Sequence, residues 1–401
     1  MIKEHIPRPI KLIFNKDNAW TKLLWKHGKE IPIWSITSIE RMLACGTSLM
    51  GGRYYECQKP NCIHSKFIPH TCKNKACSSC GFKATEIWTQ QQKTVMPDCE
   101  HQHLTFTMPS QFWPLFKNNR WLLNHIFKCA ADTLLKWAEK QGIKVGIFGA
   151  LHTYGRRQSW HPHIHLSVTR GGLNKHRKWK SIFFKKNLVE AHWRRNITTL
   201  LRKLYSSIVL PPSLSHQIRD YDEWNRFLNT HYQRKWHVHF AKKTKHLKHT
   251  VNYIGRYIKK PPISGSKLRH YAGGDVVFDY LDHNDKTYKS LTLSQEEMLL
   301  RFLSHVPDKH FKMIRYFGFL SNRKRGELLP IIYEQLNQIV ETAKQPTFCA
   351  MFINFTNSNP YRCILCDGPL VFSGYQNGQT NEELLEIRRN TLKRNRRYKP
   401  C

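Results

Sequence analysis

The stretch Trp160-His161-Pro162-His163-Ile164-His165-Leu166 contains the pattern that decides the fold. Polar and apolar residues alternate in it, as they do in a β-strand with one buried face. His163 and His165 then share a face, about 6.5–7 Å apart along the strand, while Ile164 points into a core. Two imidazoles placed in this way can bind one divalent ion and leave room for substrate oxygens. Taken alone, two solvent-exposed histidines in a chain with 23 histidines explain the pair equally well.

The preceding residues extend this strand into a predicted β-hairpin. Residues 144–154 alternate in the same way, and the polar sequence GRRQSWH separates them from residues 162–169. His152 lies on the first predicted strand and is the candidate for a third metal ligand. His161 is nearer in sequence, but it precedes a proline and is the poorer choice geometrically. A second His-x-His pattern, His237–His239, has no comparable hairpin beside it, so we treat it as a lesser candidate or as a contact to phosphate.

Two tyrosines lie one turn apart on a helix that we predict over residues 250–260. Tyr253 and Tyr257 are at positions i and i+4, and the double proline 261–262 ends the helix. On spacing alone, an aromatic pair that packs into the core is the favoured interpretation. A phenol is also a nucleophile that can attack phosphorus, and many lysines flank this pair. A histidine-bound ion would polarise the phosphate for such an attack.

Cysteines are concentrated in the first 80 residues of a chain that contains 12 of them. The spacings Cys57-x4-Cys62 and Cys77-x2-Cys80 predict the two knuckles of a structural zinc site. Cys72, His64 and His70 are further candidates for one of its four ligand positions. Buried, unligated thiols are the alternative, but paired knuckles in a chain without a secretory signal favour zinc.

A second, smaller cysteine pattern lies near the end of the chain. Cys363 and Cys366 form a single CxxC pair, which is only half of a zinc site. A small C-terminal zinc knuckle and a chance spacing explain this pair equally well. The chain around it ends in a basic run, RRNTLKRNRRYKPC.

The charge of the chain points to nucleic acid as its partner. The 401 residues carry 65 Lys and Arg against 28 Asp and Glu, a formal net charge of +37 at pH 7. A polyanion would relieve the repulsion among so many cations. An anionic membrane is the competing polyanion, but no apolar run of about 20 residues is present to span a bilayer. We therefore expect a cytoplasmic protein, associated with the nucleoid when bound to DNA, with no membrane partner.

Several motifs in unbroken order make the chain resemble a known family. A His-hydrophobe-His strand followed by a tyrosine pair resembles the HUH endonuclease superfamily, which includes rolling-circle replication initiators, relaxases and single-strand transposases. Over about residues 20–325 the series resembles the rolling-circle transposases of insertion-sequence family ninety-one. The motifs in question are HTCKNKACSSCG (70–81), HLTFTMP (103–109), LHTYGRRQSWHPHIHLSV (151–168), NYIGRYIKKPPIS (252–264) and FKMIRYFGFLSNRKR (311–325).

The resemblance implies both an architecture and a set of functional residues. It implies an α+β chain, in which a small Cys-rich zinc-binding domain precedes an HUH nuclease with a mainly antiparallel central sheet flanked by helices. We expect domains at residues 1–98 and 99–330, followed by a basic C-terminal appendage at 331–401. By motif, His163 and His165 are metal ligands and Tyr253 and Tyr257 are nucleophiles, with Mg²⁺ or Mn²⁺ as the catalytic ion and Zn²⁺ as the structural one.

The expected function is cleavage and joining of single-stranded DNA at insertion-sequence ends through phosphotyrosine intermediates. No GxxxxGK[ST] loop is present in the sequence, so we expect the host replication machinery to separate the strands. A rolling-circle plasmid replication initiator would share this chemistry. A non-catalytic zinc-dependent DNA-binding regulator would use the basic surface and the zinc module but not the tyrosines.

Overall fold

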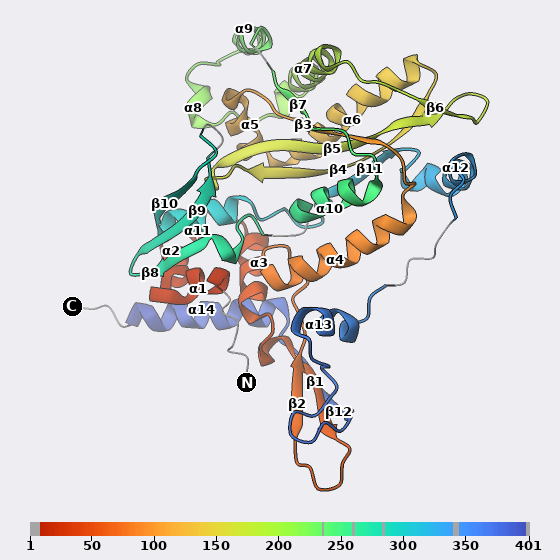
Figure 1. The fold of residues 1–401 in the computed structure, drawn as a ribbon. Helices are drawn as coiled ribbons and strands as arrows, with labels where there is room; N and C mark the ends of the chain where they lie inside the picture. Colours follow the sequence, from red (N-terminus) through yellow and green to blue (C-terminus); the bar gives the residue numbers. More distant parts are fainter. Residues whose placement is uncertain (1–8, 235, 259–260, 283–284, 340–344, 398–401) are drawn as a thin grey trace.

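The computed structural model describes residues 9–234, 236–258, 261–282, 285–339 and 345–397. The chain is α+β, as predicted. Within the described residues, no helix combines the length and the apolarity needed to cross a bilayer. Figure 1 shows a large sheet between two layers of helices, a second mixed region, and a narrow three-stranded projection.

The central sheet is antiparallel throughout and contains the predicted hairpin. Its strand order is β11–β4–β5–β3–β7, with β6 paired to the end of β5. The strands are β3 (His101–Phe106), β4 (Lys144–Tyr154), β5 (Trp160–Leu173), β6 (Trp179–Ser181), β7 (Val238–Phe240) and β11 (Ile314–Gly318). Because β5 has partners on both edges, its register is fixed from two sides.

Helices cover both faces of this sheet (Figure 1). On one face Leu104, Leu151, Ile164 and Leu166 belong to a large buried core. The helices on this side are α5 (Trp113–Asn118), α6 (Leu123–Lys140), α7 (Lys186–Lys203), α8 (Pro212–Ser215) and α9 (Tyr221–Tyr232). On the other face Phe148 packs with residues of α4 (Ser78–Val95), α10 (Leu247–Ile258) and α12 (Asn322–Gln335). Alternation sends the histidines of β5 to this second face.

A second core joins the N-terminal helices to a sheet from the middle of the chain. The strand order of this sheet is β10–β9–β8. The elements are α1 (Pro9–Asn15), α2 (Ala19–His27), α3 (Ile33–Ala44), β8 (Leu268–Ala272), β9 (Asp275–Leu281), β10 (Tyr288–Ser294) and α11 (Gln295–Ser304). Ser294 accepts a hydrogen bond from the Glu297 backbone N–H at 3.1 Å and so caps α11.

The C-terminal segment, within the range 331–401 that we expect to be a basic appendage, folds back onto the N-terminal part. The projection in Figure 1 consists of β1 (Gly52–Cys57), β2 (Ser65–Pro69) and β12 (Leu370–Gln376), in the order β12–β1–β2. β12 pairs antiparallel with β1. Helix α13 (Phe348–Thr356) precedes this strand, and α14 (Asn381–Arg397) packs along α3. The free edge of β1 would otherwise expose unpaired backbone groups, and β12 covers it.

One buried ion pair holds α14 in place. Arg388 donates from Nε and Nη2 to the two carboxylate oxygens of Glu40 on α3, at 2.8 and 3.3 Å. Glu40 is nearly inaccessible and also accepts from Trp20 Nε1 at 2.7 Å. Thr21 accepts a further bond from Arg388 Nη1 at 3.1 Å. The C-terminal helix is therefore anchored by a charge that the N-terminal helices bury.

Replacing Arg388 by Ala is expected to lower the free energy of unfolding by roughly 3 kcal/mol, because it leaves the Glu40 carboxylate buried without its counter-charge. Urea unfolding followed by circular dichroism measures this loss. Arg389→Ala is the matched control, since Arg389 is exposed and forms only a 3.5 Å contact with Glu386. It should change stability by no more than about 0.5 kcal/mol. Equal effects of the two variants would contradict the anchoring role of Arg388.

Candidate active site and cysteine clusters

Three histidines meet on one face of the central sheet. His152 on β4 is directly opposite His163 on β5 in the antiparallel register, and His165 follows two residues later on the same face. Their ring centroids are 5.3 Å (152–163), 4.5 Å (152–165) and 4.9 Å (163–165) apart. One nitrogen of each ring lies within 4.8 Å of a nitrogen of the other two. The structure thus brings together the two histidines of the motif and the proposed third ligand, which we call the histidine triad.

Hydrogen bonds outside the triad orient its rings. Nδ1 of His163 lies 2.8 Å from the carbonyl oxygen of His161, so it carries the proton and donates to that oxygen. Nδ1 of His165 lies 3.1 Å from His103 Nε2 and 3.2 Å from Thr105 Oγ1. In His163 this leaves Nε2 to face an ion, the arrangement in which an outer partner fixes the tautomer of a metal-binding histidine.

Burial keeps the triad neutral. It lowers the pKa of His152 and His163 well below the usual value of a histidine, and it lowers the pKa of His165 to about 3. The neighbouring imidazoles act in the same direction, because a second positive charge so close would be repelled. A neutral imidazole is the form that binds a metal ion. Near pH 7 the three rings are ready to accept one.

The tyrosine helix lies against the same face of the sheet. Leu247, Val251 and Ile254 are the buried residues that attach α10 to the sheet and to α4. Gly255 allows the close approach to α4, because a Cβ atom there would lie 2.8 Å from Thr89 Oγ1. Tyr253 is half exposed on the flank of the helix.

A single imidazole lies between Tyr253 and the triad. The Tyr253 ring meets the ring of His103 edge-on, with centroids 4.9 Å apart. His103 in turn stacks on His165 at 5.3 Å. Tyr257 belongs to α10, but its side chain lies outside the described residues, so its position relative to the triad stays a prediction.

Two other chemically active side chains, Tyr316 and His239, lie on neighbouring strands of the central sheet. Tyr316 on β11 is largely buried; its hydroxyl accepts from Trp88 Nε1 at 2.9 Å and lies 3.1 Å from Gln92 Oε1. Burial also raises the pKa of Tyr316, which disfavours the phenolate. His239 on β7 is opposite Thr105 and is exposed at the edge of the triad's face.

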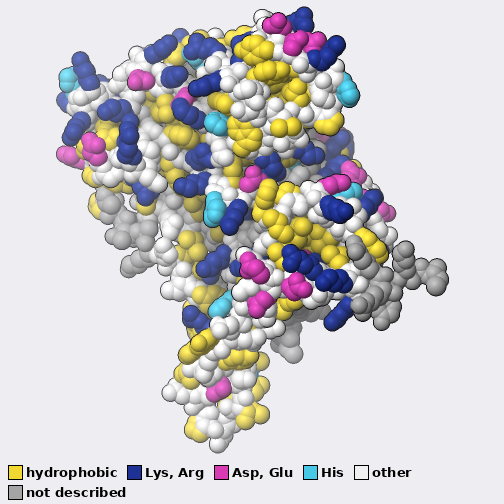
Figure 2. Space-filling model, turned by 180° about the vertical axis from the view of Figure 1, so that it is seen from behind, with side chains coloured by type: hydrophobic (Ala, Val, Ile, Leu, Met, Phe, Trp, Pro, Cys, Tyr) yellow, Lys and Arg dark blue, Asp and Glu magenta, His cyan; other side chains and the backbone are white. Residues whose placement is uncertain are grey.

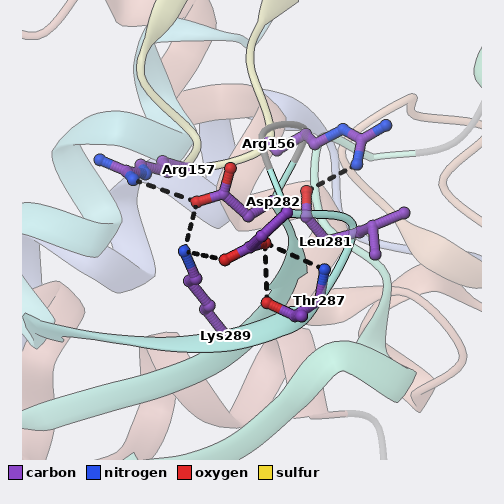
Figure 3. A network of polar contacts seen from close by, with 7 residues as sticks. Arg156, Arg157, Leu281, Asp282, Thr287 and Lys289 are labelled. Atoms are coloured by element: carbon purple, nitrogen blue, oxygen red, sulfur yellow. Dashed lines mark hydrogen bonds and ion pairs between the residues drawn. The ribbon is translucent and has the colours of Figure 1, made fainter.

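The turn between β4 and β5 is held by polar contacts to the β9–β10 hairpin (Figure 3). Arg156 Nη1 donates to the carbonyl oxygen of Leu281 at 2.6 Å. The Arg157 guanidinium lies 3.8 Å from the Asp282 carboxylate, which also accepts from Lys289 Nζ at 3.0 Å. The β4–β5 hairpin carries the triad, and these contacts attach its turn to the second core.

The first cysteine cluster consists of Cys45, Cys72, Cys77 and Cys80. Their sulphur atoms lie within 4.8 Å of one another and all four residues are buried. Cys45 follows α3, and Cys80 lies in the first turn of α4. The Cys45–Cys80 and Cys72–Cys80 sulphur distances are 3.7 and 3.6 Å. Tetrahedral zinc with bonds of ~2.3 Å sets such distances at about 3.8 Å.

The structure thus divides the predicted zinc ligands differently from the sequence analysis. Cys57 and Cys62 do not join Cys77 and Cys80 in one site; they form a second cluster with Cys363 and Cys366. Cys45 and Cys72 occupy the two ligand positions that the sequence pattern assigned to Cys57 and Cys62, and Cys45 is not among the predicted ligands. His64 and His70 belong to neither set of four. Cys45 was missed because it stands alone in the sequence, 27 residues before Cys72.

Basic side chains are spread over the body of the molecule. Figure 2 shows Lys and Arg scattered across this face with few Asp and Glu among them, whereas the narrow projection shows little charge. The net charge of +37 comes from the 65 Lys and Arg in the chain, which outnumber the 28 Asp and Glu. On this face Lys and Arg are spread widely and are not gathered in one place.

Two family models match the chain. One, described as "Putative transposase", matches residues 146–327, and the other, "Transposase zinc-binding domain", matches residues 16–108. The first contains His152, His163, His165 and Tyr253, and the second contains the whole first cysteine cluster. Together with this cluster, the second match supports structural zinc. The fold and these matches define a transposase with a zinc-binding domain.

Curated relatives specify the family. The chain is 45% identical to "Transposase for insertion sequence element IS801" of Pseudomonas savastanoi pv. phaseolicola, over 96% of this chain and 94% of that one. It is 27% identical to a putative transposase of Sinorhizobium fredii, over 82% of this chain and 86% of the relative. No solved structure matches the chain significantly. The chain belongs to the insertion-sequence transposases of family ninety-one, as its motifs predict.

Stability should fall as the pH is lowered through the range 6.5 to 4. Burial lowers the folded-state pKa of His101 and His103 to about 4 and that of His305 to about 3. Unfolded histidines titrate near 6.5, so below that pH the unfolded state binds protons that the folded state excludes. Each such histidine adds a slope that approaches roughly 1.4 kcal/mol per pH unit. Urea unfolding at pH 7.5, 6.5 and 5.5, without added divalent ion, measures it.

The variant His101→Phe measures how much one histidine contributes to the pH dependence of stability. The ring of His101 is 1% exposed and packs edge-on against Phe148, so a phenyl ring fits the site while the titration disappears. The variant is expected to be less stable at pH 7.5, because the hydrogen bond from Nδ1 to the Cys99 carbonyl is lost. Its stability should depend less steeply on pH. An unchanged slope would contradict the assignment.

Proposed function

We propose that this chain is a metal-dependent transposase of the HUH type, which cuts and rejoins single-stranded DNA at insertion-sequence ends through phosphotyrosine links. Transposition would follow a rolling-circle scheme, with the host replication machinery separating the strands. The observation that supports this most directly is the position of Tyr253 beside the histidine triad. The family of the chain supports DNA as the substrate, and its net charge of +37 supports binding of a polyanion.

The triad fits a divalent ion. Three neutral imidazoles converge and contribute no negative charge. Phosphate oxygens and water can therefore occupy the remaining coordination positions of a bound ion. We propose His152, His163 and His165 as the ligands, and Mg²⁺ or Mn²⁺ as the ion. The nitrogen ligands favour Mn²⁺ of these two, because Mg²⁺ prefers oxygen. When bound, the ion would polarise the scissile phosphate and stabilise the leaving oxygen.

The tyrosines supply the nucleophile. The hydroxyl of Tyr253 gives up its proton to solvent as its oxygen attacks phosphorus, and the bond from phosphorus to the 3′ oxygen breaks. The 5′ phosphate stays on the tyrosine, and the 3′ oxygen takes up a proton and leaves as a hydroxyl that can prime synthesis. Rejoining is the reverse attack by a 3′ hydroxyl. Tyr257, one turn further along α10, would serve the other end or the target strand, so that both links need not form on one residue.

The tyrosine assignment is tested with a labelled single-stranded oligonucleotide that carries the element end, in the presence of Mn²⁺. Wild-type protein is expected to form an adduct that survives SDS. Tyr253→Phe and Tyr257→Phe should each keep partial activity, and the double variant should form no adduct. The folding of each should persist, because one hydroxyl is removed with little change in volume. Tyr271→Phe, on β8, is the control and should behave as wild type.

Adducts that persist in the double variant would contradict the mechanism and point to Tyr271 or Tyr316. DNA binding without any adduct, even by wild-type protein, would favour the non-catalytic regulator. A plasmid replication initiator would give the same adducts, but the transposase family of the chain argues against it.

The histidine assignment is tested separately from DNA binding. The variant His163→Ala with His165→Ala is expected to lose cleavage while DNA affinity stays within about twofold, because the basic surface provides most of that affinity. Loss of a residue that only hydrogen-bonds a metal ligand weakens metal binding roughly 10-fold. His152→Ala removes a proposed ligand itself, so it should weaken Mn²⁺ binding by at least this factor, and excess Mn²⁺ should restore cleavage. Calorimetry with Mn²⁺ and filter binding of DNA measure the two effects. Wild-type cleavage by the double variant would exclude the triad as the metal site.

Affinity for single-stranded DNA should fall steeply with salt. Each Lys or Arg contact with phosphate releases counterions, which gives a slope of about −0.7 per contact in a plot of log affinity against log salt. Fluorescence anisotropy between 50 and 300 mM salt measures it. A flat response would contradict the inference drawn from the charge of the chain.

A further inference from the structure

The second cysteine cluster joins the two ends of the chain. Cys57 closes β1 and Cys62 follows it, whereas Cys363 and Cys366 precede β12. The Cys57–Cys366 sulphur distance is 3.4 Å and the Cys62–Cys363 distance is 3.6 Å, between residues 309 and 301 positions apart. All four sulphur atoms lie within 4.8 Å of one another. These contacts are far longer than a disulfide bond of ~2.05 Å.

The spacing of the four sulphurs is that of a tetrahedral ion site. Zinc–sulphur bonds of ~2.3 Å place the four sulphurs about 3.8 Å apart, which is close to both measured contacts. Two disulfides would instead draw the atoms into two separate pairs. Without an ion, the four thiols could form only weak hydrogen bonds with one another, because S–H is a weak donor and sulphur a weak acceptor. The geometry therefore favours a single ion shared by all four residues.

The surroundings of the cluster suit four thiolates. His64 Nδ1 lies 3.2 Å from Cys363 Sγ, and the Leu365 backbone N–H points at the same sulphur at 3.4 Å. Gly368 leaves room for the sulphurs, because a Cβ atom there would lie 3.2 Å from Cys57 Sγ and 3.3 Å from Cys366 Sγ. Lys59 Nζ donates to the Cys366 carbonyl at 2.9 Å and brings a positive charge beside the cluster.

We propose that Cys57, Cys62, Cys363 and Cys366 bind a second structural zinc ion, which clasps the C-terminal segment to the N-terminal sheet. Two of the four ligands lie beyond both regions matched by the family models. The pairing of β12 with β1 and the docking of α14 on α3 complete this closure. The site is separate from the first cysteine cluster and does not depend on the proposed catalytic role of the triad.

The clasp also builds a surface hollow from both ends of the chain. Arg53 and His70 from the N-terminal part face Phe372 and Tyr375 of β12 across it. Neither side forms the hollow alone, so it should exist only while β12 stays paired.

The test counts zinc in the purified full-length chain by mass spectrometry. Wild type is expected to hold two zinc ions per chain. Cys363→Ser with Cys366→Ser, and separately Cys57→Ser with Cys62→Ser, should each hold one, kept by the first cluster. Cys349→Ser is the matched control; Cys349 lies on α13 in the same segment, contacts Asn359 and belongs to no cluster, so this variant should keep two.

Limited proteolysis provides the structural readout. The Cys363→Ser, Cys366→Ser variant should lose the segment 345–397 to protease faster than wild type and the Cys349→Ser control. One zinc per chain in wild type, or two in either double variant, would overturn the proposal. If both double variants are insoluble, Co²⁺ substitution of wild type decides by itself: two thiolate-bound ions per chain support the clasp, and one excludes it.

Discussion

The antiparallel pairing of β4 with β5 is the constraint on which the candidate active site depends. It places His152 opposite His163, and it does so only in one register. A slip by one residue would turn His163 and His165 into the core beneath α6 and send Ile164 to the helix α10 side. Packing forbids the slip, because Ile164 and Leu166 are fully buried on the first face. Gly149 adds to this: a Cβ atom there would lie 2.2 Å from a Leu166 methyl carbon.

The same pairing buries three imidazoles together, and this burial lowers the stability of the folded protein at acidic pH. Rings that are buried among one another must stay neutral, so the folded protein excludes protons that the unfolded chain would accept. A bound ion reverses this balance, since it binds the folded arrangement and not the unfolded one. His103 contacts both groups: its Nε2 lies 3.1 Å from His165 Nδ1 and its ring meets the ring of Tyr253, so it lies between the proposed metal ligand and the proposed nucleophile.

The sequence predicted what is local and missed what is distant. The β4–β5 hairpin and the tyrosine helix have periodic patterns within a few residues, and the structure contains both. The partnership of Cys57 with Cys366 has no such signal, because 309 residues separate them and each half resembles an incomplete knuckle. Cys45 has no neighbouring cysteine to form a pattern. The pairing of β12 with β1 was hidden for the same reason, since strand partners are chosen by the tertiary fold.

Helix α4 connects the first cysteine cluster to the candidate active site. Its first turn contains Cys80, so an ion held by that cluster would fix where the helix begins. Further along, Trp88 and Gln92 contact the hydroxyl of Tyr316 on the central sheet, and Thr89 meets Gly255 of α10. Helix α10 therefore packs against α4, and the first cysteine cluster holds the N-terminal end of α4. Because α10 carries Tyr253, structural zinc in the N-terminal domain would help to set the position of the proposed nucleophile.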